Sequence, residues 1–147
     1  METVQVSAEF ARLLVFSGSA SLFFSSLIGV GMLVPMQPWG RKWAKGLNFR
    51  QLGAAHLDWI MLGLMQAMAA GLIVAFALSP APWVVWAIII GGWLNPLPYV
   101  FRAFGIDAFA MAGGPLQRFA SGLGAVSSTL ILVGWAVLLH AAWQAWG

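Results

Sequence analysis

Long apolar stretches separated by short polar ones dominate this chain, and they predict helices that cross a membrane. A helix of about 20 apolar residues spans the hydrocarbon core of a bilayer. Four stretches reach that length, at about 8–34, 51–78, 83–104 and 116–143. Segments rich in proline, glycine or basic residues separate them. The pattern predicts an all-α, integral membrane four-helix bundle, with residues 1–147 forming a single transmembrane domain.

The composition agrees with a membrane protein and excludes several classes of site. Of the 147 residues, 61% are hydrophobic and only 7% are charged, whereas soluble domains carry roughly 25% charged residues. The chain has no cysteine, which excludes disulfides, iron–sulfur clusters, thiolate-ligated haem and cysteine zinc sites. The net charge is +3, but the basic residues lie mostly between the apolar stretches, so no nucleic-acid partner is expected.

The distribution of basic residues predicts how the chain crosses the membrane. Only Arg12 lies on the side of the termini, whereas the other side carries Arg41, Lys42, Lys45, Arg50, Arg102 and Arg118. Cytoplasmic loops carry the excess of Lys and Arg, so we expect the first and third loops in the cytoplasm and both termini outside. The first apolar stretch follows Glu2 and Glu9 rather than a basic leader, and we interpret it as a permanent span rather than a signal peptide.

Polar residues inside the second and third stretches are the candidate functional residues. His56 and Asp58 lie within the second stretch, and an ionisable residue inside a span is by default a candidate for function. The third stretch returns to the same side with Asn95 and Tyr99. We therefore expect His56, Asn95, Tyr99 and the Gly-rich loop at 105–115 to border one cavity.

Pro96, Pro98 and Asp58 add detail to the predicted arrangement of the second and third helices. Pro96 and Pro98 cannot donate backbone hydrogen bonds, so the third helix should bend there. Asp58 stands two positions from His56 and should point in another direction on a helix. It faces a neighbouring span, a basic residue such as Arg50 or Arg118, or a contact between subunits.

Each candidate also has a purely structural interpretation. His56 could be an interfacial hydrogen-bonding residue, and Asn95 and Tyr99 could join one helix to another. His140 is followed by Trp143 and Trp146, a pattern typical of the belt at a membrane surface. The methionines of the second stretch are interpreted as apolar filling rather than as metal ligands.

Three short motifs resemble those of a known family. They are AHLDWIMLG at 55–63, GGWLNPLPYVF at 91–101 and GGP at 113–115. This pattern resembles the styrene oxide isomerase family and the related hydroxylaminobenzene mutases, over roughly residues 50–139.

The resemblance implies a homotrimeric membrane protein of the bacterial inner (cytoplasmic) membrane that holds ferric haem b between subunits. His56 matches the axial ligand of the haem iron, Tyr99 the active-site tyrosine, and Asn95 the Asn of a G-W-x-N run. The chain differs from the isomerases at two positions: Leu62 precedes Gly63 where they carry an Asn, and Gly91 stands where they carry an Asp. Both of those family residues are thought to position the epoxide, so the substrate class stays open.

The implied activity is an isomerisation without water or an electron donor. Ferric haem acts as a Lewis acid in a Meinwald rearrangement, and an aryl epoxide such as styrene oxide becomes an aldehyde, phenylacetaldehyde, by a 1,2-hydride shift. One alternative is a mutase that converts an arylhydroxylamine to an aminophenol. Another is a haem-binding membrane protein for storage, sensing or electron transfer. His56 is the only histidine at its end of the bundle, which favours an open coordination position and so catalysis or gas binding. A small transporter is least favoured, because no inverted repeat is visible.

Overall fold

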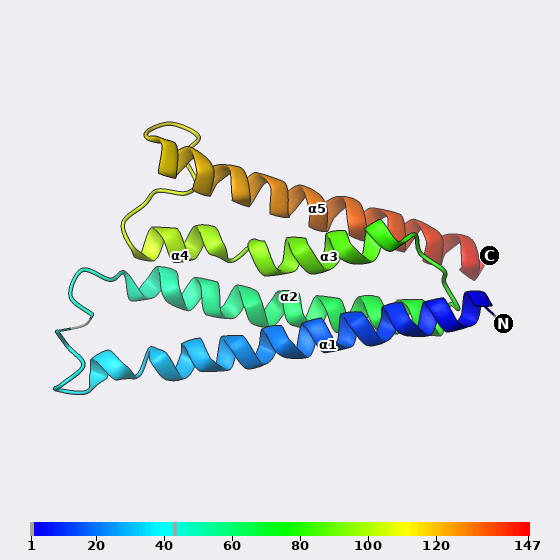
Figure 1. Ribbon diagram of the computed structural model, residues 1–147, viewed down its shortest axis with the longest axis horizontal. Helices are drawn as coiled ribbons and strands as arrows, with labels where there is room; N and C mark the ends of the chain where they lie inside the picture. The colour runs from blue at the N-terminus through cyan, green and yellow to red at the C-terminus, as the bar shows by residue number, and fades with distance from the viewer. Residues whose placement is uncertain (1, 43) are drawn as a thin grey trace.

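The computed structural model describes residues 2–42 and 44–147 and is built of helices, with no strand in that part of the chain (Figure 1). The elements are α1 (Glu2–Gly31), the 3-10 turn η1 (Val34–Met36), α2 (Phe49–Ala75), α3 (Pro82–Leu94), α4 (Leu97–Ala103) and α5 (Pro115–Trp146). Four helical segments are long and apolar enough to cross a membrane, with α3 and α4 together forming the third. The predicted all-α class and the four spans are confirmed.

The helix ends differ from the predicted spans by a few residues. The outer helices α1 and α5 have 30 and 32 residues, longer than the roughly 20 that hydrocarbon requires, because a helix need not end where the lipid does. The second helix ends at Ala75, before the predicted boundary. There Ala77 adopts a φ of 48°, and the Leu78 N–H donates to the Ile73 carbonyl at 2.9 Å. This is the hydrogen bond of a Schellman turn, and hydropathy does not report it.

The helices run up and down, so that both termini lie at one end of the bundle (Figure 1). Helix α1 packs along α2, and α3 packs along α5, while α2 also contacts α3 and α4. The connecting segments at 32–42, 44–48 and 104–114 lie at the other end. That end carries six of the seven Lys and Arg residues, as the charge pattern predicts.

Helices α1 and α2 approach closely where two glycines face each other. A Cβ atom added to Gly18 would lie 2.5 Å from the Gly63 carbonyl oxygen, and one added to Gly63 would lie 2.8 Å from the Gly18 carbonyl oxygen. Ser17, Ser21 and Ser25 are buried along the same side of α1. Small residues allow such contact in lipid, and this contact sets which residues of the two helices meet.

The third span is interrupted at Asn95 and Pro96, between α3 and α4. The Asn95 N–H still donates to the Gly91 carbonyl at 2.9 Å, but Pro96 has no N–H for the next bond in the series. The predicted bend is therefore confirmed. It leaves Asn95 at the junction of two helices, deep in the bundle.

Large apolar side chains cover the outside of the bundle. Phe16 is 74% exposed, Leu132 70% and Met68 65%. Soluble monomers rarely expose apolar surface on this scale. Together with the four apolar helices, this surface indicates a multi-pass membrane protein.

Candidate functional site

His56 lies on α2 and is held by Ser25 of α1. Its Nδ1 atom lies 2.7 Å from the Ser25 hydroxyl oxygen and 2.8 Å from the Ser25 main-chain carbonyl oxygen. The Ser25 hydroxyl also donates to the His56 main-chain carbonyl at 2.7 Å. Ser25 is fully buried and His56 is half-buried. One edge of the imidazole is therefore fixed by helix α1.

The His56 ring also lines an apolar cavity. A Cβ atom added to Gly29 would lie 3.0 Å from Cε1, 3.5 Å from Nε2 and 3.6 Å from Nδ1 of His56, so the absence of a side chain at Gly29 leaves room beside Cε1 and the two ring nitrogens. The cavity has a volume of about 440 Å³. Apart from Gly29 and His56, its walls are Met32, Leu33, Pro35, Met36 and Phe49.

Asp58 faces a different side of α2 and joins a second group of polar residues. Two positions along a helix turn the side chain by about 200°. The Asn95 amide nitrogen donates to the Asp58 carboxyl oxygen at 2.8 Å. The Asn95 side-chain oxygen accepts from the hydroxyls of Ser127 and Ser128, each at 3.2 Å. Asn95 thus connects α2 and α5 at the break in the third span. Of the partners proposed for Asp58, the neighbouring span is correct.

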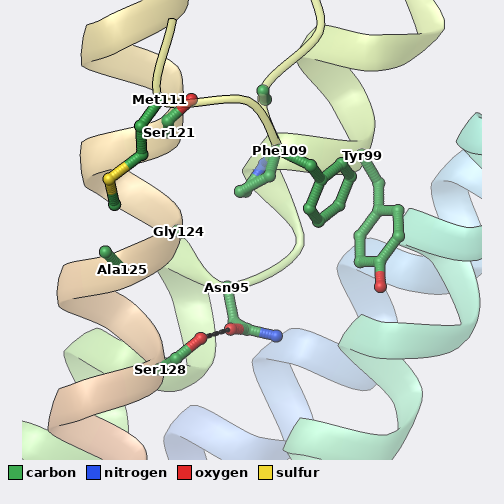
Figure 2. Close-up of a pocket in the computed structure, with 10 residues that line it drawn as sticks. Asn95, Tyr99, Phe109, Met111, Ser121, Gly124, Ala125 and Ser128 are labelled. Carbon is green, nitrogen blue, oxygen red and sulfur yellow. Dashed lines mark hydrogen bonds between the residues drawn. The ribbon is translucent and has the colours of Figure 1, made fainter.

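Asn95 and Tyr99 share a pocket of about 310 Å³, shown in Figure 2. Phe109 and Met111 of the Gly-rich loop and Ser128 of α5 also line it. The Tyr99 and Phe109 rings lie 5.1 Å apart, centroid to centroid. In the described part of the chain no hydrogen bond is made by the Tyr99 hydroxyl, which points toward α2 in Figure 2.

Several contacts hold the loop over this pocket. The Ser121 hydroxyl of α5 donates to the Ala110 carbonyl at 2.7 Å. Arg102 lies 3.6 Å from the Asp107 carboxylate and 5.2 Å from the Phe109 ring centroid. The loop is therefore tied both to α4 and to α5.

The expectation of one cavity bordered by all the candidates is wrong. Asn95, Tyr99 and the loop share a pocket, as predicted, but His56 lines the cavity beside Gly29, and the two cavities have no residue in common. The physical reason is that His56 faces α1 whereas Asp58 faces the third span. The direction in which the His56 side chain points around α2 was therefore not predicted correctly.

Gly91 and Leu62, the two positions that differ from the motifs of the isomerase family, provide no polar side chain. A Cβ atom at Gly91 would lie 2.7 Å from Ile131 Cγ1 and 2.9 Å from the Ser127 carbonyl oxygen, so α5 occupies the space of any side chain there. Leu62 is 6% exposed and belongs to the core. The carboxyl group near Asn95 comes instead from Asp58.

Ser25 and Gly29 were not among the site residues predicted from the sequence. A signal for both is present, because Ser17, Ser21, Ser25 and Gly29 follow one another at intervals of four, which aligns them on one face of a helix. Polar and small residues in such a row suit a contact between membrane helices. His140, in contrast, is exposed near the far end of α5, in agreement with its structural interpretation.

Comparison with known proteins adds no assignment: no family model, no curated protein and no solved structure matches the chain.

Proposed function

We propose that the protein is a membrane isomerase that uses ferric haem b, with His56 as axial ligand, to rearrange an aryl epoxide to an aldehyde. The observation that carries this proposal is the environment of His56. Its imidazole lies inside a membrane helix, is hydrogen-bonded at Nδ1, and lines an apolar cavity. A neutral imidazole fixed in this way is a common haem ligand.

The residues around the cavity suit a porphyrin. Cofactor sites are mostly apolar and enclose roughly 300–1,000 Å³, and this cavity, of about 440 Å³, has apolar walls apart from His56. Arg41, Lys42 and Lys45 follow its Pro35 and Met36 in sequence and are exposed. Their charges suit the two carboxylates of haem at the membrane surface.

The chain offers one histidine to the iron, because His140 lies near the far end of α5. With His56 as its one protein ligand, bound haem would keep a position open to substrate and would supply a Lewis acid for the epoxide oxygen. The protein's own part is to exclude water, which would trap a carbocation as a diol. Tyr99 has a free hydroxyl and a ring face to orient the substrate or stabilise positive charge. Asn95 lines the same pocket as Tyr99 and is itself held by its bonds to Asp58 and Ser128.

The separation of the two cavities supports an oligomer. His56 of one chain does not share a cavity with the Asn95 and Tyr99 of that chain. Around the His56 cavity, Leu33 and Met36 are 53% and 71% exposed, so a second copy has apolar surface to cover. The family resemblance implies a trimer in the bacterial inner membrane, and we propose on that ground a homotrimer with haem between subunits.

Product analysis with two substrates tests the proposal. Haem-loaded protein in membranes should convert styrene oxide to phenylacetaldehyde, and haem-free protein should not. Phenylhydroxylamine is the second substrate, because the mutase alternative predicts an aminophenol. Haem-loaded protein that converts neither substrate would contradict an isomerase and leave the non-catalytic haem-binding function.

A further inference from the structure

The three polar contacts between Ser25 and His56 determine where the imidazole carries its hydrogen. Nδ1 lies within 2.8 Å of both the hydroxyl and the main-chain carbonyl of Ser25. The hydroxyl in turn lies 2.7 Å from the His56 carbonyl. A main-chain carbonyl only accepts hydrogen bonds, and a serine hydroxyl has a single hydrogen to donate.

Counting hydrogens leaves one consistent arrangement. If Nδ1 carried no hydrogen, its lone pair would face the Ser25 carbonyl at 2.8 Å with no hydrogen between them. The hydroxyl hydrogen would also be needed twice, by Nδ1 and by the His56 carbonyl. If Nδ1 carries the hydrogen, it donates toward Ser25 and the hydroxyl donates to the His56 carbonyl. Every contact is then satisfied, and the lone pair of the neutral ring is at Nε2.

We propose that Ser25 is a positioning residue that fixes the Nδ1–H tautomer of His56 and directs the Nε2 lone pair to the ligand side beside Gly29. The identity of the ligand as haem iron rests on the proposed function, whereas the tautomer does not. A hydrogen bond to the second nitrogen of a ligating imidazole orients the ring and raises its basicity as a ligand. Ser25 therefore sets both the affinity for iron and the electron density that the imidazole donates to it.

Helix α1 provides a matched control. Ser21 lies one turn from Ser25, is likewise fully buried, and likewise donates to a carbonyl of α2, that of Trp59, at 2.9 Å. It makes no contact with His56. Ser21→Ala and Ser25→Ala therefore remove equivalent bonds between α1 and α2, and only Ser25→Ala removes a contact with the imidazole.

The first readout is nitrogen NMR of haem-free protein labelled at histidine, in which the exposed His140 is the reference. We expect wild type and Ser21→Ala to show a protonated Nδ1 and an unprotonated Nε2 on His56. Ser25→Ala keeps the main-chain carbonyl that accepts from Nδ1–H, so it should keep this tautomer and shift only the Nδ1 resonance, because the contact with the hydroxyl is lost. A hydrogen on Nε2 of His56 in wild type would overturn the proposal. This result comes from the wild-type protein alone and so does not depend on whether the variants fold.

The second readout is haem titration with the midpoint potential of the bound haem. Loss of the partner of a ligating imidazole costs about 10- to 100-fold in metal affinity. Ser25→Ala removes the hydroxyl but keeps the main-chain carbonyl, so it should weaken haem binding by about tenfold and raise the potential, and Ser21→Ala should change neither. Equal changes in both variants would reduce Ser25 to a helix-packing residue. If wild type takes up no haem, the proposed function fails, and the NMR shifts alone then decide the role of Ser25.

Discussion

Replacing Asn95 by alanine separates a structural role from a chemical one. The side chain donates to Asp58 at 2.8 Å and accepts from Ser127 and Ser128 at 3.2 Å each. These bonds cross from α2 to α5 at the point where the third span is broken. Asn95→Ala removes all three at once and leaves the Asp58 carboxyl group without its partner.

The expected loss of stability follows from these contacts. Hydrogen bonds between membrane helices average about 0.6 kcal/mol and reach about 1.7 kcal/mol. Three of them therefore contribute roughly 2 kcal/mol. A buried polar atom left without a partner costs about 1–3 kcal/mol more, which places the total for Asn95→Ala at about 3–5 kcal/mol. The Asp58–Asn95 pair alone should show a coupling energy of about 0.6–1.7 kcal/mol in a double-mutant cycle.

The assay is reversible unfolding in mixed detergent micelles, followed by tryptophan fluorescence. Thr129→Ala is the matched control, because the neighbouring Thr129 hydroxyl on α5 donates only within its own helix, to Ala125 at 2.9 Å. It should cost less than about 0.5 kcal/mol. If Asn95→Ala costs no more than Thr129→Ala, or if the coupling energy is zero, the bridging role of Asn95 is refuted. Reduced turnover without any loss of stability would then assign Asn95 to the substrate alone.

Three further predictions concern the site. Gly29→Ala places a methyl group 3.0 Å from His56 Cε1 and should weaken haem binding about tenfold, which corresponds to about 1.4 kcal/mol. Gly122→Ala is the control, because a Cβ there meets nothing within 4 Å, and it should leave haem binding unchanged. Equal haem affinities in the two variants would contradict a haem site beside Gly29. Tyr99→Phe should keep haem and cost on the order of 10²-fold in turnover, the scale of losing one hydrogen-bond donor. Wild-type rates in both Tyr99→Phe and Tyr99→Ala would remove Tyr99 from the site. The mass of the haem-loaded protein in detergent should correspond to a trimer, and haem-loaded monomer alone would reject a haem site between subunits.

Much of the fold follows from the sequence, because lipid imposes simple constraints. A span needs about 20 apolar residues and must satisfy its own backbone hydrogen bonds, which fixes the number of helices. Pro96 lacks an N–H, and this determines where the third span is interrupted. The exact end of α2 depends instead on the left-handed Ala77, a local conformation that apolar periodicity does not encode.

Part of the candidate site was predictable from the sequence, but the direction of the His56 side chain was not. Asn95 and Tyr99 are one helical turn apart and share a pocket, as their spacing predicts. The side of α2 that His56 presents to α1 depends on the close contact of Gly18 with Gly63. This contact joins residues far apart in sequence, and the residue pattern of one span does not identify the helix that packs against it.

The absorption spectrum of the purified protein tests the central claim, the ligation of haem by His56, most directly. We predict a Soret band in wild type and in His140→Ala, where the chain's other histidine is replaced. His56→Ala should lose that band while its helical circular dichroism and membrane insertion stay unchanged. A His56→Ala protein that retains the full haem content of wild type would contradict the assignment.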